Sequence, residues 1–172
     1  ANSIGYVSED RHRYGCIGGQ SIKDNITLTS LSKFRKGLTI NEFEEVRAAK
    51  HYKDVLHIKA YNVEQPVANL SGGNQQKVIF GRWMLTNPDV LLLDDPTRGI
   101  DVGAKYEIYE LIQSLAKQGK SIIMVSSEMP ELLGTCNRIL VMSAGQIAGE
   151  YVPTGDGKVD QEKILELAAK NL

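Results

Sequence analysis

Short apolar runs and amphipathic segments alternate along the second half of the chain. Residues 90–93 (VLLL) and 121–125 (SIIMV) are apolar runs bounded by polar residues, which is typical of strands buried in a parallel sheet. Between them, apolar residues recur at the spacing of one helical face, at Ala104, Ile108, Leu111, Ile112 and Leu115. This order of strand, helix and strand predicts an α/β fold in which right-handed crossovers connect parallel strands.

The first half of the chain has a different pattern. Residues 4–7 (IGYV) predict a short strand that leads into a polar loop. Residues 21–61 contain few turn-forming residues, and the apolar positions from Phe43 to Leu56 fit one face of a helix. We therefore expect a small helical subdomain between the first strand and the rest of the sheet.

The remaining elements are expected to be short. A helix should follow the N-cap residue Ser71 and end near residue 86, because Pro88 follows closely. After the second apolar run we expect a short helix, two strands joined by an SAG turn, and a closing amphipathic helix from Ile164. The chain then divides into core residues 1–20, a helical subdomain at 21–86, a second core segment at 87–150 and a tail at 151–172.

Composition limits the classes of function. The 172 residues are 42% apolar and 24% charged, as in an ordinary soluble globular domain, and the net charge is −1. A nucleic-acid partner is not expected at this charge, and we interpret the basic clusters at 11–13 and 33–36 as solvated surface. The two cysteines lack metal-ligand spacing and are expected to be reduced, and no apolar run is long enough to cross a membrane.

Two motifs stand where a parallel sheet can carry chemistry. Asp94 and Asp95 directly follow the strand at 90–93, and on their own they fit either exposed carboxylates or a metal site. Gly72 and Gly73 open a helix, where free backbone N–H groups suit a phosphate. A tight loop without a ligand is an equally good interpretation of these glycines on their own.

Longer stretches resemble a known family. LSGGNQQK at 70–77 resembles the signature motif of ABC-transporter ATPase domains, and VLLLDDPTRGID at 90–101 is similar to their Walker B strand and D-loop. PTRGIDVGAK at 96–105 and SSEMPELL at 126–133 resemble the second nucleotide-binding domain of the ATP-binding subunits of bacterial monosaccharide importers. The resemblance implies a partial P-loop NTPase fold of the ABC type, with a parallel sheet and a small helical subdomain.

The resemblance also implies nucleotide-binding residues. Ser71, Gly72 and Gly73 would contact the γ-phosphate of an ATP bound on an opposing domain, and Gln75 of the same motif is counted with them. Glu9 occupies the place of the Q-loop glutamine that senses the γ-phosphate. A carboxylate there would repel phosphate oxygens unless Mg²⁺ lies between them.

Catalytic and metal-binding residues follow from the same resemblance. Asp94 would hold Mg²⁺, through water. Asp95 stands where the family usually has the glutamate that orients the attacking water, and Asp101 matches the D-loop carboxylate or caps the following helix. Ser127 occupies the place of the switch histidine. These departures from the family pattern favour a domain that supports catalysis in its partner.

The phosphate-loop pattern GxxxxGK[ST] does not occur in these 172 residues. In the family this loop precedes the strand at 4–7, so we expect a domain without its phosphate-binding front, inactive alone. ATP and Mg²⁺ are expected only in the complete assembly. The expected partners are a second nucleotide-binding domain and transmembrane permease subunits, with a homodimer of this chain as a further option. The chain itself is expected to be cytoplasmic and peripheral on the cytoplasmic face of the bacterial inner membrane.

Two alternatives stay open at this point. The chain could be a non-catalytic interaction module that binds an intact ATPase domain or a transmembrane subunit. Chromosome-maintenance ATPases have a similar signature motif, but they carry long heptad coiled coils and a basic face, which the short predicted helices and the near-neutral charge do not favour.

Overall fold

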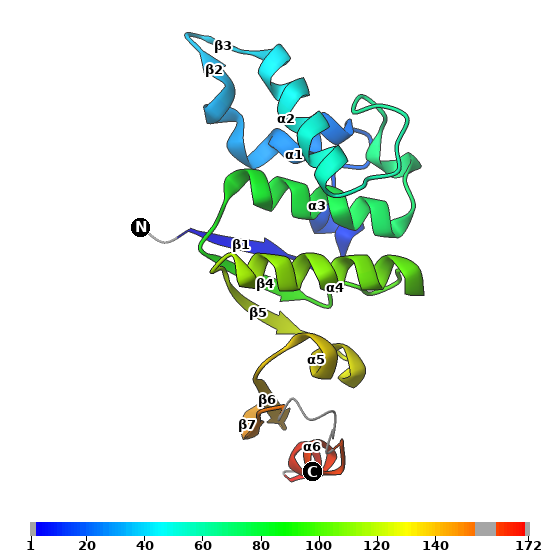
Figure 1. Cartoon of the computed structure of the whole chain (residues 1–172), viewed down its shortest axis with the longest axis vertical. Coiled ribbons are helices and arrows are strands. Elements are labelled where there is room, and N and C mark those ends of the chain that lie inside the picture. Colours follow the sequence, from blue (N-terminus) through cyan, green and yellow to red (C-terminus); the bar gives the residue numbers. More distant parts are fainter. Residues whose placement is uncertain (1–2, 154–160, 171–172) are drawn as a thin grey trace. The chain divides into compact units, whose positions relative to one another are not determined.

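The computed structural model describes residues 3–153 and 161–170 (Figure 1). The chain forms two compact units, Ala1–Val125 and Ser126–Leu172. The division into four segments that the sequence suggests stays a prediction.

The first unit is built on a three-stranded parallel sheet in the order β1–β4–β5. The strand β1 (Ile4–Val7) pairs with β4 (Val90–Asp94), and β4 pairs with β5 (Ser121–Val125). All three strands are parallel, so their carboxyl ends lie at one edge of the sheet. The predicted parallel α/β arrangement is therefore confirmed.

Two helices follow the predicted positions and form the main core with the sheet. They are α3 (Gly72–Thr86) and α4 (Val102–Lys117). Asn87 ends α3 in the left-handed region, with a φ of 59°, and Asp101 begins α4 as its N-cap. The core consists of Val7, Ile79, Phe80, Leu91, Leu93, Ile108, Ile112 and Leu115.

Apolar side chains also point to the other face of this sheet, where they stay exposed. Ile4 and Ile123 are 61% and 59% exposed, and Tyr6 and Val125 are exposed as well. Side chains alternate between the two faces of a strand, which explains why Val7 is buried while Tyr6 beside it is not.

The helical part of the first unit packs on α3. It contains α1 (Ile22–Thr27), the 3₁₀ helix Leu28–Phe34 and α2 (Glu42–Val55), and its core residues are Ile22, Ile26, Leu56, Ile58, Val67, Leu70 and Val78. The predicted apolar face of α2 is wrong at Phe43, which is 79% exposed, and at the exposed Val55. Phe43 lies in the first turn of α2, before the helix reaches the core.

A short hairpin that the sequence did not predict connects the 3₁₀ helix to α2. Its strands are β2 (Arg35–Lys36) and β3 (Thr39–Ile40), which pair antiparallel. Gly37 has a φ of 64°, which favours glycine at the turn. Two strands of two residues each are too short for a pattern of alternating side chains to be recognised.

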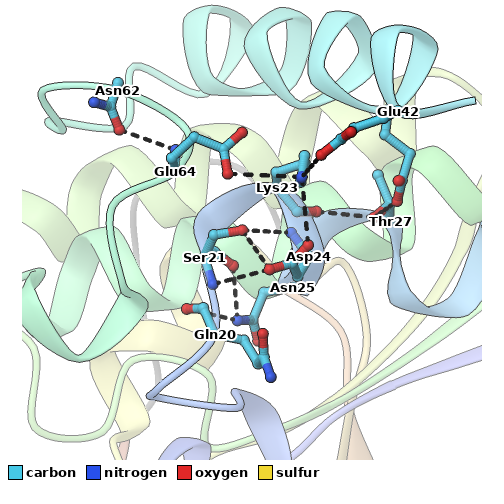
Figure 2. Close-up of polar contacts among 10 residues, drawn as sticks. Gln20, Ser21, Lys23, Asp24, Asn25, Thr27, Glu42, Asn62 and Glu64 are labelled. Atoms are coloured by element: carbon cyan, nitrogen blue, oxygen red, sulfur yellow. Dashed lines mark hydrogen bonds and ion pairs between the residues drawn. The ribbon is translucent and has the colours of Figure 1, made fainter.

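Polar groups fix the start of α1 (Figure 2). Ser21 and Asp24 form a capping box, in which the Ser21 Oγ accepts from the Asp24 N–H at 3.0 Å. The buried Lys23 ammonium lies 3.5 to 3.8 Å from carboxylate oxygens of Asp24, Glu42 and Glu64. Burial opposes the charge of Lys23, but these three carboxylates raise its pKa above the ordinary value.

The second unit has its own small apolar core. It contains α5 (Met129–Thr135), the strands β6 (Ile139–Ser143) and β7 (Gln146–Tyr151), and α6 (Gln161–Ala169), around the core residues Ile139, Val141, Tyr151 and Ile164. The two strands form a separate antiparallel pair, whose turn residues Ala144 and Gly145 have positive φ angles. Residues 154–160 of the predicted tail lie outside the described residues.

Candidate functional site

The start of α3 carries the predicted phosphate-binding motif. Ser71 has the extended backbone of an N-cap residue, but its hydroxyl does not cap the helix. Instead the Ser71 Oγ accepts from the Asn74 Nδ2 at 2.8 Å. No side chain among the described residues caps the first turn of α3, so its backbone N–H groups are available to an anion at the positive end of the helix.

Close packing gives the two glycines of this motif a second role. A Cβ atom on Gly73 would lie 2.5 Å from the Ala104 Cβ, so only glycine lets α3 approach α4 this closely. A Cβ atom on Gly72 would lie 2.8 Å from the Arg11 Nη2. Packing against α4 thus requires glycine at Gly73, while at Gly72 the near atom is the end of the long Arg11 side chain.

Arg11 connects the segment after β1 with two other parts of the site. Its Nη1 donates to the Arg98 carbonyl at 2.7 Å and its Nη2 to the Gly99 carbonyl at 3.3 Å. Its Nε donates to the Gln75 Oε1 at 3.3 Å. The interpretation of Arg11 as solvated surface is therefore wrong, because a guanidinium offers several donors in one plane and this one uses them on the 98–99 turn and on α3.

Gln75 is buried and faces inward from α3. Its Nε2 donates to the carbonyls of Val67 and Leu70, at 3.3 and 3.2 Å. With Arg11 on its Oε1, the Gln75 amide holds the segment that leads into the motif. A direct contact of Gln75 with nucleotide stays a prediction, while its observed contacts position the motif.

The two predicted carboxylate residues, Asp94 and Asp95, lie at the end of β4 and differ in their contacts and backbone conformation. The Asp94 Oδ2 accepts a hydrogen bond from the Tyr6 hydroxyl at 2.9 Å, and this bond raises the pKa of Tyr6 above its ordinary value. Asp95 has a φ of 40°, and its backbone N–H donates to the Val125 carbonyl at 2.9 Å. The left-handed backbone at Asp95 turns the chain sharply away from the strand, and aspartate tolerates this region better than most residues.

The other predicted site residues lie in different surroundings. Glu9 forms an ion pair with Arg98, so its charge is balanced by the D-loop segment. Asp101 caps α4, since its Oδ1 accepts from the Ala104 N–H at 3.0 Å. Ser127 is exposed and belongs to the second unit. The other predicted site residues belong to the first unit.

A hollow of about 240 Å³ opens beside the start of α3. Its charged lining residues include Lys59, Lys77 and Glu107, which are not among the site residues that the sequence predicts. The buried Lys77 ammonium lies 2.7 Å from the Glu107 Oε2, and this hydrogen bond lowers the pKa of Glu107. Lys77 ends the motif at 70–77, so its position was a signal that could have been followed.

The carboxylate at the end of β4 fits a magnesium ion that is bound together with a nucleotide. No group of three or more His, Cys, Asp or Glu side chains that could hold a metal occurs in residues 3–153 and 161–170. Asp94 can supply a carboxylate oxygen at the edge of the sheet, and Mg²⁺ commonly takes one or two carboxylates and fills its other positions with phosphate oxygens and water.

Solved structures share this fold. A dimeric ATP-binding cassette in a post-hydrolysis state with ADP and phosphate aligns with a TM-score of 0.73 and 23% identity, over 90% of this chain and 64% of that one. An inward-facing ABC transporter of the metal-chelate type aligns with a TM-score of 0.75 and 16% identity, over 98% of this chain and 64% of that one. At these identities the likeness supports the ABC-type fold that the sequence predicted.

Curated relatives are more similar in sequence. The L-arabinose transport ATP-binding protein of Geobacillus stearothermophilus is 49% identical over 170 residues, which are 99% of this chain and 33% of that protein. The xylose import ATP-binding protein of Moorella thermoacetica is 52% identical over 168 residues, 98% of this chain and 32% of that protein. The chain thus spans about a third of the length of these relatives.

No described helix is both long enough and apolar enough to span a bilayer. A family profile for ABC transporters matches residues 2–98, which include the strand β1, the helical part, the motif at the start of α3 and both carboxylates of β4. The chain therefore belongs to the ABC transporter family.

Proposed function

We propose that this chain is part of the ATP-binding subunit of an ABC-type sugar importer, and that it supplies the signature motif to an ATP site shared with a partner domain. The uncapped start of α3, held beside the 98–101 turn by Arg11, is the observation that carries this proposal. The relatives named for arabinose and xylose transport support the substrate class.

Different residues of this chain would bind the phosphate and the metal ion. ATP supplies the free energy of transport when it is hydrolysed. The first-turn N–H groups of α3 and the exposed Ser71 would bind its γ-phosphate from across the interface. Because the Tyr6 hydroxyl occupies one oxygen of Asp94, the other oxygen is left for Mg²⁺ or its water.

Hydrolysis at this domain's own site is expected to be slow. Asp95 is one methylene shorter than the glutamate that the family uses, and a displacement of about 1 Å costs about a hundredfold in rate. The ion pair with Arg98 reduces the repulsion that the Glu9 carboxylate would exert on phosphate. This domain therefore fits a supporting role in which its partner hydrolyses ATP.

The 172 residues alone are proposed to have no measurable ATPase activity and weak or no affinity for Mg·ATP, because they contain no phosphate-loop motif. Titration calorimetry with Mg·ATP tests this directly. Stoichiometric binding by the isolated chain would refute the proposal for the chain alone.

The shared site is tested by association with an intact nucleotide-binding domain from one of the relatives. ATP should strengthen the complex, and Ser71→Arg should abolish the ATP effect, since Ser71 is exposed and the larger side chain would block the start of α3. Ser114→Arg on the exposed side of α4 is the matched control. An ATP effect that survives Ser71→Arg contradicts the assignment.

A second candidate function is a non-catalytic interaction module. The exposed apolar residues Ile4, Tyr6, Ile123 and Val125 on one sheet face favour self-association or binding to another protein. Sedimentation equilibrium of the chain and of an Ile123→Lys variant tests it. A dimer that the variant dissociates, without any effect of ATP, would favour this candidate over the shared ATP site.

This function requires a second nucleotide-binding domain and transmembrane permease subunits as partners, and it places the chain on the cytoplasmic face of the bacterial inner membrane. They are part of the proposal.

A further inference from the structure

The β2–β3 hairpin projects from the helical part of the first unit (Figure 1, upper left). Leu38, in its turn, is 98% exposed, and Phe43, three residues after Ile40, is 79% exposed. We call Lys33, Arg35, Lys36, Leu38, Ile40 and Phe43 the hairpin surface. Leu38 at the hairpin turn and Phe43 at the adjoining start of α2 therefore expose most of their large apolar side chains, which is a feature that needs an explanation.

Packing within the chain does not provide one. Neither Leu38, Ile40 nor Phe43 belongs to the apolar clusters of the described residues. A Cβ atom on Gly37 would meet nothing within 4 Å, so the turn stands clear of the rest of the unit. A two-stranded ribbon of this length also contributes little stability of its own. The apolar residues at the hairpin are therefore not explained by the core.

Cations lie directly beside these apolar side chains. The Arg35 Nε donates to the Gly37 carbonyl at 2.8 Å, which holds the guanidinium at the turn that carries Leu38. Lys36 precedes the turn and is exposed, and Lys33 lies at the base of the hairpin, where its ammonium donates to the Leu85 carbonyl. The local charge is therefore positive, although the whole chain has a net charge of −1.

The hairpin itself contains no carboxylate that could balance these cations. Residues 33–41 contain no Asp or Glu. The next exposed acidic residues in the sequence are Glu42 and Glu44. The Glu42 carboxylate lies 3.5 Å from the Lys23 Nζ, and the Glu44 carboxylate lies 3.8 Å from the Arg47 Nη1. The positive charge is therefore concentrated at Arg35 and Lys36 beside Leu38, whereas Phe43 lies between two acidic residues that are paired with other cations.

We propose that the hairpin surface binds an anionic phospholipid membrane, with Leu38 and Phe43 entering the interface and Arg35 and Lys36 pairing with headgroups. An apolar tip with adjacent cations is the chemistry that such an interface selects. The proposal rests on the proposed function only for the expectation that a membrane is nearby.

Charge distinguishes this partner from a membrane protein. The cytoplasmic loops of membrane proteins are enriched in Lys and Arg, so they would repel the hairpin cations. The cytoplasmic leaflet carries anionic lipids, which attract juxtamembrane cations. The lipid surface is therefore the partner that fits both the apolar and the charged residues of the hairpin.

The test is co-sedimentation of the 172-residue chain with phosphatidylcholine vesicles, with and without phosphatidylglycerol. Binding should require phosphatidylglycerol and should weaken when salt rises from about 0.1 M to about 1 M, which shortens the Debye length from about 10 Å to about 3 Å. Arg35→Gln with Lys36→Gln should weaken binding about 25-fold, at about fivefold for each charge. Leu38→Asn should weaken it about tenfold.

Matched controls separate a specific surface from general adsorption. Leu165→Asn removes an exposed leucine from α6, and Lys50→Gln with Lys117→Gln removes two exposed cations elsewhere. Both controls should bind as the unaltered chain does. Circular dichroism of each hairpin variant should match the unaltered chain, because the substituted side chains are exposed.

Absence of binding to anionic vesicles, or equal losses in the hairpin variants and the controls, overturns the proposal. Unchanged vesicle binding together with weaker capture by a permease subunit assigns the hairpin to a protein partner and also overturns it. The vesicle assay contains no nucleotide, so its failure leaves the shared ATP site untouched. Failure of the ATP-dependent association likewise leaves the vesicle result standing.

Discussion

Substitution of Gly73 by alanine measures how closely α3 and α4 are packed. The added Cβ would lie 2.5 Å from the Ala104 Cβ and 3.4 Å from the Ile100 Cγ2. Two carbon atoms are at their best separation near about 3.5 to 4.0 Å, so the helices must separate locally by about 1 Å. The clashing atom is the first atom of a side chain and cannot rotate away.

The expected loss follows from two opposing effects. Overpacking of this kind costs about 1–3 kcal/mol. Alanine gains up to about 1 kcal/mol over glycine in a helix, which offsets part of it. A net loss of about 1–2 kcal/mol should lower the urea midpoint by about 0.5–1 M for a slope of about 2 kcal/mol per M.

Fluorescence of Trp83, the one tryptophan of the chain, is the suitable measurement, because Trp83 packs against the core of the first unit. Unfolding of the second unit then does not obscure the transition. Gly103→Ala is the matched control, since its Cβ would meet only the Asp101 Oδ1, at 3.5 Å. That variant should be at least as stable as the unaltered chain.

A double variant decides whether the contact itself is responsible. Ala104→Gly removes the opposing Cβ, so Gly73→Ala should cost less in its presence than in the unaltered chain. If Gly73→Ala matches the control in stability, or if Ala104→Gly does not reduce its cost, the close approach of the two helices does not explain the glycine.

Three other variants test further parts of the site. Glu107→Gln leaves the buried Lys77 ammonium without its carboxylate and should lower the free energy of unfolding in urea by about 1–2 kcal/mol. This loss is smaller than the loss expected for a fully buried ion pair, because the Glu107 side chain is half exposed. The hydrogen bond with Lys77 lowers the pKa of Glu107, so the pair adds fully to the free energy of unfolding above pH 4.5 and loses this effect as the pH falls through the lowered pKa. The free energy of unfolding of Glu107→Gln should therefore change less with pH in this acidic range. Burial raises the pKa of the Cys16 thiol from 9.0 to about 11, so the unfolded chain loses this proton at a lower pH than the native state does. The free energy of unfolding should therefore fall as the pH rises from 9.0 to about 11, and Cys16→Ala should remove this fall. Arg11→Ala should cost about 2–3 kcal/mol and raise hydrogen exchange at residues 98–100 more than in α1, whereas a uniform rise in exchange would contradict its bridging role.

The parallel sheet and the helices that flank it could be predicted because their patterns are long and regular. The run at 90–93 and the helical face from Ala104 to Leu115 each repeat one period several times. The β2–β3 hairpin could not be predicted, because two-residue strands do not repeat any period. The exposed Phe43 shows a related limit, since periodicity marks a helical face but not where along the helix the core begins.

The residue types of the candidate site were evident from the sequence, but their contacts were not. The sequence predicts Asp101 as the D-loop carboxylate or as the cap of the following helix, and its observed contact is the cap of α4. Arg11 was misjudged because its three acceptors come from residues 64 or more positions away, on α3 and the 98–99 turn. A charge cluster looks the same in the sequence whether water or distant carbonyl groups surround it.

The order β1–β4–β5 has a consequence for the time course of folding. Ile4 pairs with Val90, 86 positions along the chain, so β1 cannot join the sheet until the entire helical part is synthesised and folded back. Contacts within that helical part are closer in sequence and can form earlier, because loop closure over long separations is slow. The Tyr6–Asp94 hydrogen bond would then be among the last contacts to form, and refolding followed at Tyr6 should lag behind the gain of helix.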